Sequence, residues 1–157
     1  CSFEKDLCGW IQGAAEDLDW ERWSGPTGTP NTGPSGDHTS GEGYYLYIKS
    51  SSHGRSGASA HLKSPLSPPT GPDGYCFTFW YHMFGTTVGS LRMSVFDISS
   101  NHITSMWQRK GSQGSEWQMA QSYVKVTQVH QILIEASVGG LSGHIAIDDL
   151  SITEGAC

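Results

Sequence analysis

Four cysteines constrain this chain most strongly, because two of them stand at its first and last positions. They are Cys1, Cys8, Cys76 and Cys157, and no two of them form the short C-x-x-C spacing of a zinc or redox site. An even number of such cysteines is typical of disulfides formed in an oxidising compartment. Three pairings are possible, and the closeness of the first two cysteines favours Cys1–Cys8 with Cys76–Cys157. The alternative is four reduced core cysteines in a cytosolic protein.

The pattern of apolar residues predicts an all-β fold. Aromatic and β-branched runs alternate with Gly, Pro and Ser clusters, and no stretch of about ten residues has helical periodicity. With 157 residues, we expect a single domain spanning 1–157, built as a β-sandwich of about ten short strands. The strongest strand candidates are 44–48, 77–84, 90–98, 131–136 and 144–152, and the weaker ones are 20–23, 58–62, 104–108 and 117–126.

Charge and composition argue against several classes of partner. The net charge is −6, and Lys and Arg form no cluster, which argues against binding to nucleic acid or to an anionic membrane surface. No run of about 18 apolar residues is present, so we expect no insertion into a bilayer. Because the chain starts at a cysteine and not at Met, we expect it to be an excised or processed piece of a longer polypeptide.

Signatures of catalysis are missing from the sequence. It contains no G-x-S-x-G elbow, no H-E-x-x-H motif, no phosphate-binding glycine loop and no dinucleotide fingerprint. The seven histidines have no metal-ligand spacing. The sequence therefore predicts a domain that is not an enzyme.

The positions of the acidic residues point instead to a cation. Asp148 and Asp149 interrupt a strand, IAIDDL, in which either register turns one carboxylate inward unless a bulge intervenes. Glu4 follows Phe3 in an expected opening strand, Asp17 precedes a tryptophan, and Asp37 lies in the long polar segment 24–43. If the first and last strands are neighbours, these carboxylates meet and suit Ca²⁺, which takes roughly six to eight oxygen ligands. Pairing with arginine side chains, or exposure to solvent, is the alternative that the spacing leaves open.

In their order along the chain, the motifs resemble the MAM domain, an extracellular module named for meprin, the A5 protein and the mu-type receptor phosphatase. The resemblance covers essentially the whole chain. It rests on CSFEKDLCGW (1–10), DLDW (17–20), GPSGDHT (33–39), GYYLYI (43–48), AHLKSP (60–65), CFTFWYHMFG (76–85), QILIE (131–135), GHIAIDDL (143–150) and the terminal Cys157.

The resemblance implies a jelly-roll β-sandwich with the first cysteine bonded to the second and the third to the fourth. It also implies a role without catalysis in adhesion and recognition, through a protein partner or self-association, in a secreted protein or a membrane protein's ectodomain. Because some family members carry a cation near the strand ends, a structural Ca²⁺ is expected here. Of the adjacent acids we favour Asp148 as the ligand, since Leu150 and Ile152 would then share its face of the strand.

Two other functions stay open at this point. Jelly rolls often bind sugars on aromatic-lined faces, and the six tryptophans supply candidate platforms for a carbohydrate-binding module. The chain is also compatible with an accessory domain of a larger extracellular protease, whose catalytic part would lie outside this sequence.

Overall fold

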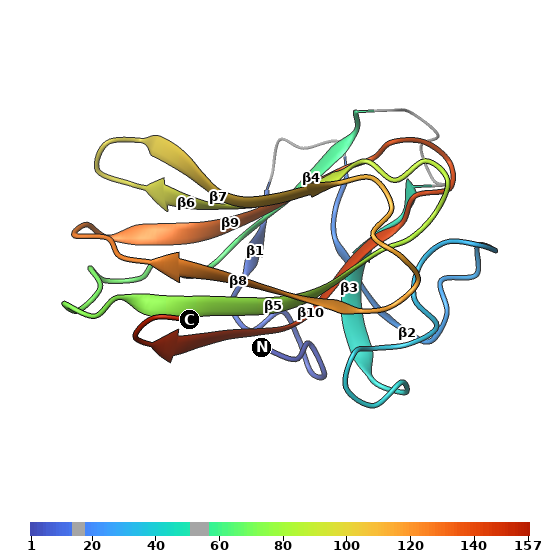
Figure 1. The fold of residues 1–157 in the computed structure, drawn as a ribbon, viewed down its shortest axis with the longest axis horizontal. Coiled ribbons are helices and arrows are strands. Elements are labelled where there is room, and N and C mark those ends of the chain that lie inside the picture. Colours follow the sequence, from blue (N-terminus) through green and yellow to red (C-terminus); the bar gives the residue numbers. More distant parts are fainter. Residues whose placement is uncertain (14–17, 51–56) are drawn as a thin grey trace.

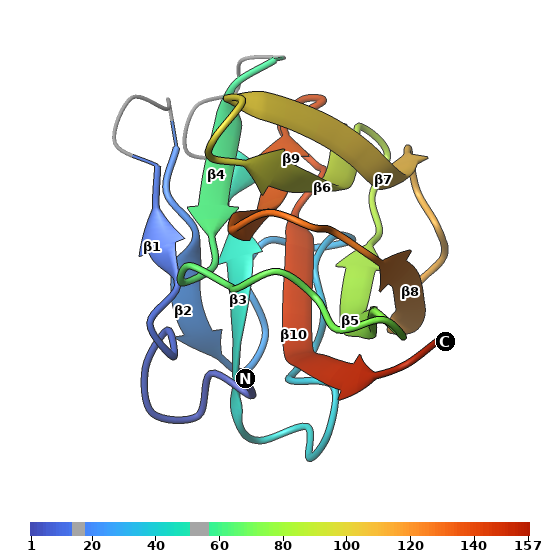
Figure 2. The same cartoon turned by 90° about the vertical axis from the view of Figure 1, so that its left-hand side faces the viewer.

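The strands of the protein form two antiparallel sheets that pack face to face (Figure 1). The computed structural model describes residues 1–13, 18–50 and 57–157. The first sheet, sheet A, has the strand order β1-β4-β9-β6-β7, and the second, sheet B, has the order β2-β3-β10-β5-β8 (Figure 2). The strands are β1 (Ile11–Gln12), β2 (Glu21–Ser24), β3 (Tyr44–Ile48), β4 (Ser59–Lys63), β5 (Tyr75–Met83), β6 (Ser90–Asp97), β7 (His102–Lys110), β8 (Gln118–Val124), β9 (His130–Ser137) and β10 (Ile145–Glu154).

Each of the strong and weak strand candidates is present, and the all-β sandwich is confirmed. The expected opening strand at Phe3 and Glu4 is wrong, since Phe3 has a φ of 58°, which an extended strand does not adopt. The strand β3 begins and ends at the predicted residues, and the other predicted strands differ by one or two residues at an end. The short strand β1 was not predicted, because a strand of two residues gives no alternation to detect. No helix in the described ranges is long and apolar enough to cross a membrane.

The core lies between the two sheets and is rich in aromatic rings. From β5, the side chains of Phe77, Phe79, Tyr81 and Met83 all face inward, as alternation along a strand requires. Trp107 of the edge strand β7 reaches across to them, with ring centroids 5.1 Å from Phe79 and 4.9 Å from Tyr81. These edge-to-face contacts add to the burial of the rings and connect the open edge of sheet A to sheet B.

Two disulfides lie near the ends of the described chain, and one of them fixes the last residue to sheet B. Cys1 is bonded to Cys8, and Cys76 of β5 to Cys157, with Cα–Cα distances of 6.0 and 4.9 Å. This is the pairing that the sequence favours. The backbone of Cys1 also pairs with Leu150 of β10, whose N–H donates to the Cys1 carbonyl at 2.9 Å. The opening segment therefore lies beside the last strand.

A bulge in β10 decides where the adjacent acids point. The pairing of β10 with β5 shifts register between Asp148 and Ser151, and Asp149 has a φ of 49°. Ile147 before the bulge and Leu150 after it both belong to the core, whereas Asp148 faces the opposite side of the sheet, beside its pairing partner Trp80. The expectation that Asp148 shares a face with Leu150 is therefore wrong, because the extra residue reverses the alternation.

Candidate functional site

The segment 25–43 between β2 and β3 covers the outer face of sheet B, the face turned away from sheet A. Its His38 ring stacks on Trp80 of β5 with centroids 3.7 Å apart, and its Gly36 carbonyl accepts a hydrogen bond from the Trp117 indole at 3.1 Å. The long polar loop is thus held down by aromatic side chains of the sheet. Asp148 lies beneath this cover.

Asp148 is completely buried, with 0% of its surface exposed. One carboxylate oxygen accepts a hydrogen bond from the backbone N–H of His38 at 3.0 Å, and the other from the backbone N–H of Asp149 at 2.8 Å. Burial raises the pKa of Asp148 to about 7, and the negative charges of Asp149 and Asp37 raise it further. The two backbone hydrogen bonds lower this pKa, but by less. A positively charged group, or a proton, is therefore needed to balance the charge of this buried carboxylate.

Asp37 lies close enough for its charge to act on Asp148, and it is itself only 5% exposed. Its carboxylate accepts hydrogen bonds from the backbone N–H groups of Gly43, at 3.1 Å, and of Ser40, at 3.3 Å. Burial alone would raise the pKa of Asp37, but these hydrogen bonds outweigh it and hold the pKa below its ordinary value. The Asp37 side chain therefore stays ionised.

Glu4 meets Asp37 above Gly43. A Cβ atom added to Gly43 would lie closer than 3.0 Å to both carboxylate oxygens of Glu4 and to Oδ2 of Asp37. One Glu4 oxygen accepts a hydrogen bond from the backbone N–H of Tyr44 at 3.0 Å. Glycine at position 43 is thus what lets the two carboxylates approach each other.

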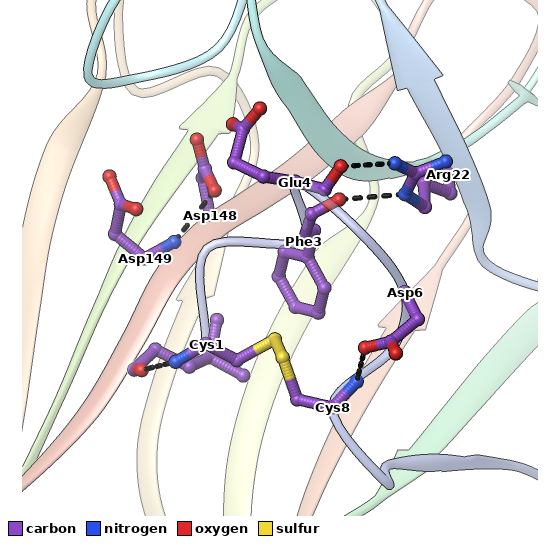
Figure 3. The surroundings of a disulfide bond; sticks show 9 residues. Cys1, Phe3, Glu4, Asp6, Cys8, Arg22, Asp148 and Asp149 are labelled. Carbon is purple, nitrogen blue, oxygen red and sulfur yellow. Dashed lines mark hydrogen bonds between the residues drawn. A yellow bond between two sulfur atoms is a disulfide. The ribbon is translucent and has the colours of Figure 1, made fainter.

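Arg22 positions Glu4 through the backbone and not through the carboxylate. Its guanidinium donates to the carbonyl oxygens of Phe3, at 2.7 Å, and of Glu4, at 2.5 Å (Figure 3). The Glu4 carboxylate points the other way, toward the side on which the Asp148 carboxylate lies (Figure 3). Pairing with this arginine, one of the alternatives left open by the sequence, is therefore not how Glu4 is balanced.

The remaining predicted ligands are placed differently. Asp149 accepts a hydrogen bond from Nδ1 of His38 at 2.7 Å and another from the Thr39 hydroxyl, so its carboxylate fastens the covering loop. Asp17 lies outside the described residues. Within the described ranges no group of three or more His, Cys, Asp or Glu side chains is already arranged as a metal site.

The structure therefore brings Glu4, Asp37 and Asp148 into one neighbourhood and gives Asp149 a different contact. Sequence reasoning missed the role of Gly43 and the stacking of His38 on Trp80. The density of glycine in the loop was the available signal, but it does not show which glycine adjoins the acids.

These features define a disulfide-bonded β-sandwich of jelly-roll type, with acidic side chains gathered where its first segment meets its last strand. The family model for the MAM domain, meprin/A5/mu, matches residues 1–157. The chain therefore belongs to the MAM family, and the resemblance inferred from its motifs is confirmed.

Curated relatives agree with this assignment. MAM domain-containing protein 2 of Mus musculus is 38% identical over 159 residues, a match that covers 100% of this chain and 23% of the relative. MAM domain-containing glycosylphosphatidylinositol anchor protein 2 of Mus musculus is 37% identical over 172 residues, covering 100% of this chain and 18% of the relative. The chain thus spans less than a quarter of the length of these proteins.

Solved structures share the fold at low identity. TmCBM61 in complex with beta-1,4-galactotriose superimposes with a TM-score of 0.65 at 17% identity, covering 98% of this chain and 94% of that one. The K1 cleaved adhesin domain of Lys-gingipain from Porphyromonas gingivalis W83 has a TM-score of 0.62 at 16% identity, with coverage of 99% and 97%. At such identities the similarity concerns the fold alone.

Proposed function

We propose that this MAM domain is a non-catalytic extracellular recognition module that binds a protein partner or a second copy of itself, and that a structural Ca²⁺ holds its covering loop in place. Membership of the MAM family and a relative named as a glycosylphosphatidylinositol anchor protein support the extracellular part. Two disulfides are the cysteine chemistry of an oxidising compartment.

The observation that carries the calcium proposal is the convergence of Glu4, Asp37 and Asp148 from three distant parts of the chain. Their donor atoms are carboxylate oxygens, which hard cations such as Ca²⁺ prefer. Two of them are nearly or completely buried, and like charges in low dielectric repel each other unless a cation or a proton intervenes. Backbone hydrogen bonds already occupy some of these oxygens, so binding requires the carboxylates to turn toward a common centre.

A bound Ca²⁺ would neutralise the charge of these carboxylates and cross-link three parts of the chain, without taking part in catalysis. It would join the opening segment through Glu4, the loop through Asp37 and β10 through Asp148. Asp17, the remaining predicted ligand, stays part of the proposal. Asp148 lies beneath the loop and Asp37 is nearly buried within it, whereas Glu4 reaches the pair from the exposed opening segment. Two buried ligands suit a structural role.

Thermal melting across a calcium titration tests this proposal. The oxidised chain is first treated with a chelator, and then melted at increasing calcium concentrations. A ligand that binds only the native state adds about 2.7 kcal/mol at a hundredfold excess over its Kd. We expect a saturable rise in Tm that Glu4→Gln abolishes and Asp73→Asn, a change in an exposed turn, leaves intact. A Tm that calcium does not change would contradict the calcium site.

The recognition role is tested separately. Analytical ultracentrifugation over a wide concentration range detects self-association, and a pull-down from an ectodomain library detects a partner, each with calcium and with chelator. A chain that stays monomeric and captures no ectodomain in either condition would contradict the recognition role.

Binding of carbohydrate is a second candidate, favoured by a polar cavity on sheet A, the polar cup, whose lining includes Arg92 and Glu135. Solved structures of similar fold include TmCBM61 with beta-1,4-galactotriose and the CBM22-2 xylan-binding domain of Paenibacillus barcinonensis Xyn10C. Three of the six tryptophans do not supply a platform, because Trp20 is buried and Trp10 and Trp107 pack against the core.

A further inference from the structure

A row of polar side chains crosses four strands on the outer face of sheet A. His61 of β4 pairs with Glu135 of β9, Glu135 with Arg92 of β6, and Arg92 with Gln108 of β7. Cross-strand partners share a face of the sheet. The residues on both sides of His61, Arg92 and Glu135 belong to the core, and Trp107, which precedes Gln108, packs against it. The whole row therefore faces outward.

A second row beside the first is made of serines. Ser59 of β4 pairs with Ser137 of β9, which pairs with Ser90 of β6. Together the two rows line a cavity of about 290 Å³. This volume is close to the lower end of the range for small-molecule sites, roughly 300–1,000 Å³, and suits one sugar-sized ring.

The charges in this cup compensate each other. One oxygen of Glu135, Oε2, lies 2.8 Å from the Arg92 guanidinium and 3.2 Å from Nε2 of His61. The Glu135 side chain is 15% exposed, whereas that of Arg92 is 41% exposed. The Arg92 guanidinium keeps donors available for a ligand, because a planar fork has more N–H groups than this one contact uses.

The second oxygen of Glu135, Oε1, is buried and has no hydrogen-bond partner among the described residues. A buried acceptor without a partner is rare in native proteins and calls for a donor. Because Oε1 lies below the surface of the cup, a ligand hydroxyl reaches it when the half-exposed Arg92 side chain turns aside. A hydroxyl group is a small neutral donor that also accepts from the arginine.

We propose that this cup binds one ring of a neutral saccharide through its hydroxyl groups. A cationic ligand would be repelled by the Arg92 guanidinium, and an anionic ligand by the Glu135 carboxylate. Adjacent hydroxyl groups can instead donate to Glu135, accept from Arg92, and both donate to and accept from the serines. No Trp, Tyr or Phe is among the described residues that line the cup. The expected Kd is therefore only about 1 mM, since stacking adds nothing.

This inference gives a location to the second candidate function and is independent of the calcium site, which lies on the other sheet. The test is a titration of the isotope-labelled chain followed by ¹H–¹⁵N NMR, with beta-1,4-galactotriose as the neutral probe and trigalacturonate as its acidic counterpart. We expect galactotriose to shift the amide signals of Ser59, Ser90 and Ser137, equally with calcium and with chelator, and trigalacturonate to leave them unchanged.

Variants locate the binding. Arg92→Met is expected to weaken galactotriose binding at least tenfold, and Gln108→Ala, an exposed position that folding tolerates, about threefold. Gln121→Ala on the outer face of sheet B is the matched control and should bind like the parent. Three results would each overturn the proposal: no shifts at about 10 mM galactotriose, shifts that map to another face, or equal weakening by Gln108→Ala and Gln121→Ala. A failure here leaves the calcium-dependent melting unaffected, so the two proposals fail separately.

Discussion

Replacing Asp148 by Asn should change stability in opposite directions without and with calcium. In the chelated protein, burial raises the pKa of Asp148 from 3.8 to about 7. The folded state therefore binds more protons than the unfolded state between about pH 4 and pH 7, and the free energy of unfolding falls as the pH rises through this window. The asparagine side chain of the Asp148→Asn variant carries no charge, so the variant does not lose stability in this way.

The magnitude follows from the pKa difference and the hydrogen bonds. A shift from 3.8 to about 7 corresponds to roughly 4 kcal/mol at pH 8, because each pKa unit is worth about 1.4 kcal/mol. Asparagine offers one acceptor oxygen to the two backbone N–H groups of His38 and Asp149, and leaving one without a partner costs about 1–3 kcal/mol. The net gain expected for Asp148→Asn in chelator is about 1–3 kcal/mol at pH 8. At about pH 4 the charge no longer contributes and only the loss of the hydrogen bond remains, so the variant should be less stable than the parent there.

Urea unfolding followed by tryptophan fluorescence measures both effects. At pH 8 in chelator, Asp148→Asn should raise the urea midpoint, whereas in saturating calcium the parent should gain stability and the variant should not. Asp97→Asn is the control, because Asp97 is the last residue of β6 in sheet A, whereas the cluster lies on sheet B. Its calcium response should equal that of the parent. An Asp148→Asn variant that is less stable than the parent in chelator at pH 8, or that keeps the full calcium response, would refute the reasoning.

Three further perturbations test other parts of the structure. Removing the Cys76–Cys157 bridge by a double Ser substitution should lower the free energy of unfolding by about 4–5 kcal/mol, since the bridge spans a sequence separation of 81. Urea unfolding of oxidised samples measures this loss. A loss below about 1 kcal/mol would contradict it. Gly43→Ala should weaken calcium binding in isothermal titration calorimetry, because the new methyl group meets two carboxylates, whereas Gly71→Ala, with open space around it, should not. Equal affinities in both variants would show that Gly43 does not shape the site. Burial lowers the pKa of His144 from 6.5 to about 4. Acidification from pH 6.5 to pH 4 should therefore lower the free energy of unfolding by up to roughly 3 kcal/mol. In melts at pH 4 and pH 7, His144→Phe should abolish this part of the acid sensitivity. An unchanged pH dependence would exclude His144 as its source.

The strands could be predicted because each carries its own local signal. Segment 44–48 is a run of bulky residues bounded by glycine and a polar residue, and its ends were predicted correctly. The neighbourhood of Glu4 and Asp148 was also predictable, since it follows from placing the first segment beside the last strand. The strand predictions use the residues of one segment at a time, and the predicted neighbourhood uses only the order of the segments along the chain.

The bulge at Asp149 and the polar cup could not be predicted in this way. A left-handed backbone at an aspartate has no sequence signature comparable to glycine, yet it decides which way Asp148 faces. The row from His61 to Gln108 depends on the register of four strands that are separated along the chain. Register is set by packing across the whole sheet and not by any one segment.

A crystal structure of the oxidised chain grown with calcium, with anomalous data to identify the ion, tests the central claim most directly. The proposal predicts a calcium peak between the opening segment, the covering loop and β10, with carboxylate oxygens of Glu4, Asp37 and Asp148 at about 2.3–2.6 Å from it. The absence of anomalous density there, with the three carboxylates bonded only to protein donors and water, would contradict the claim.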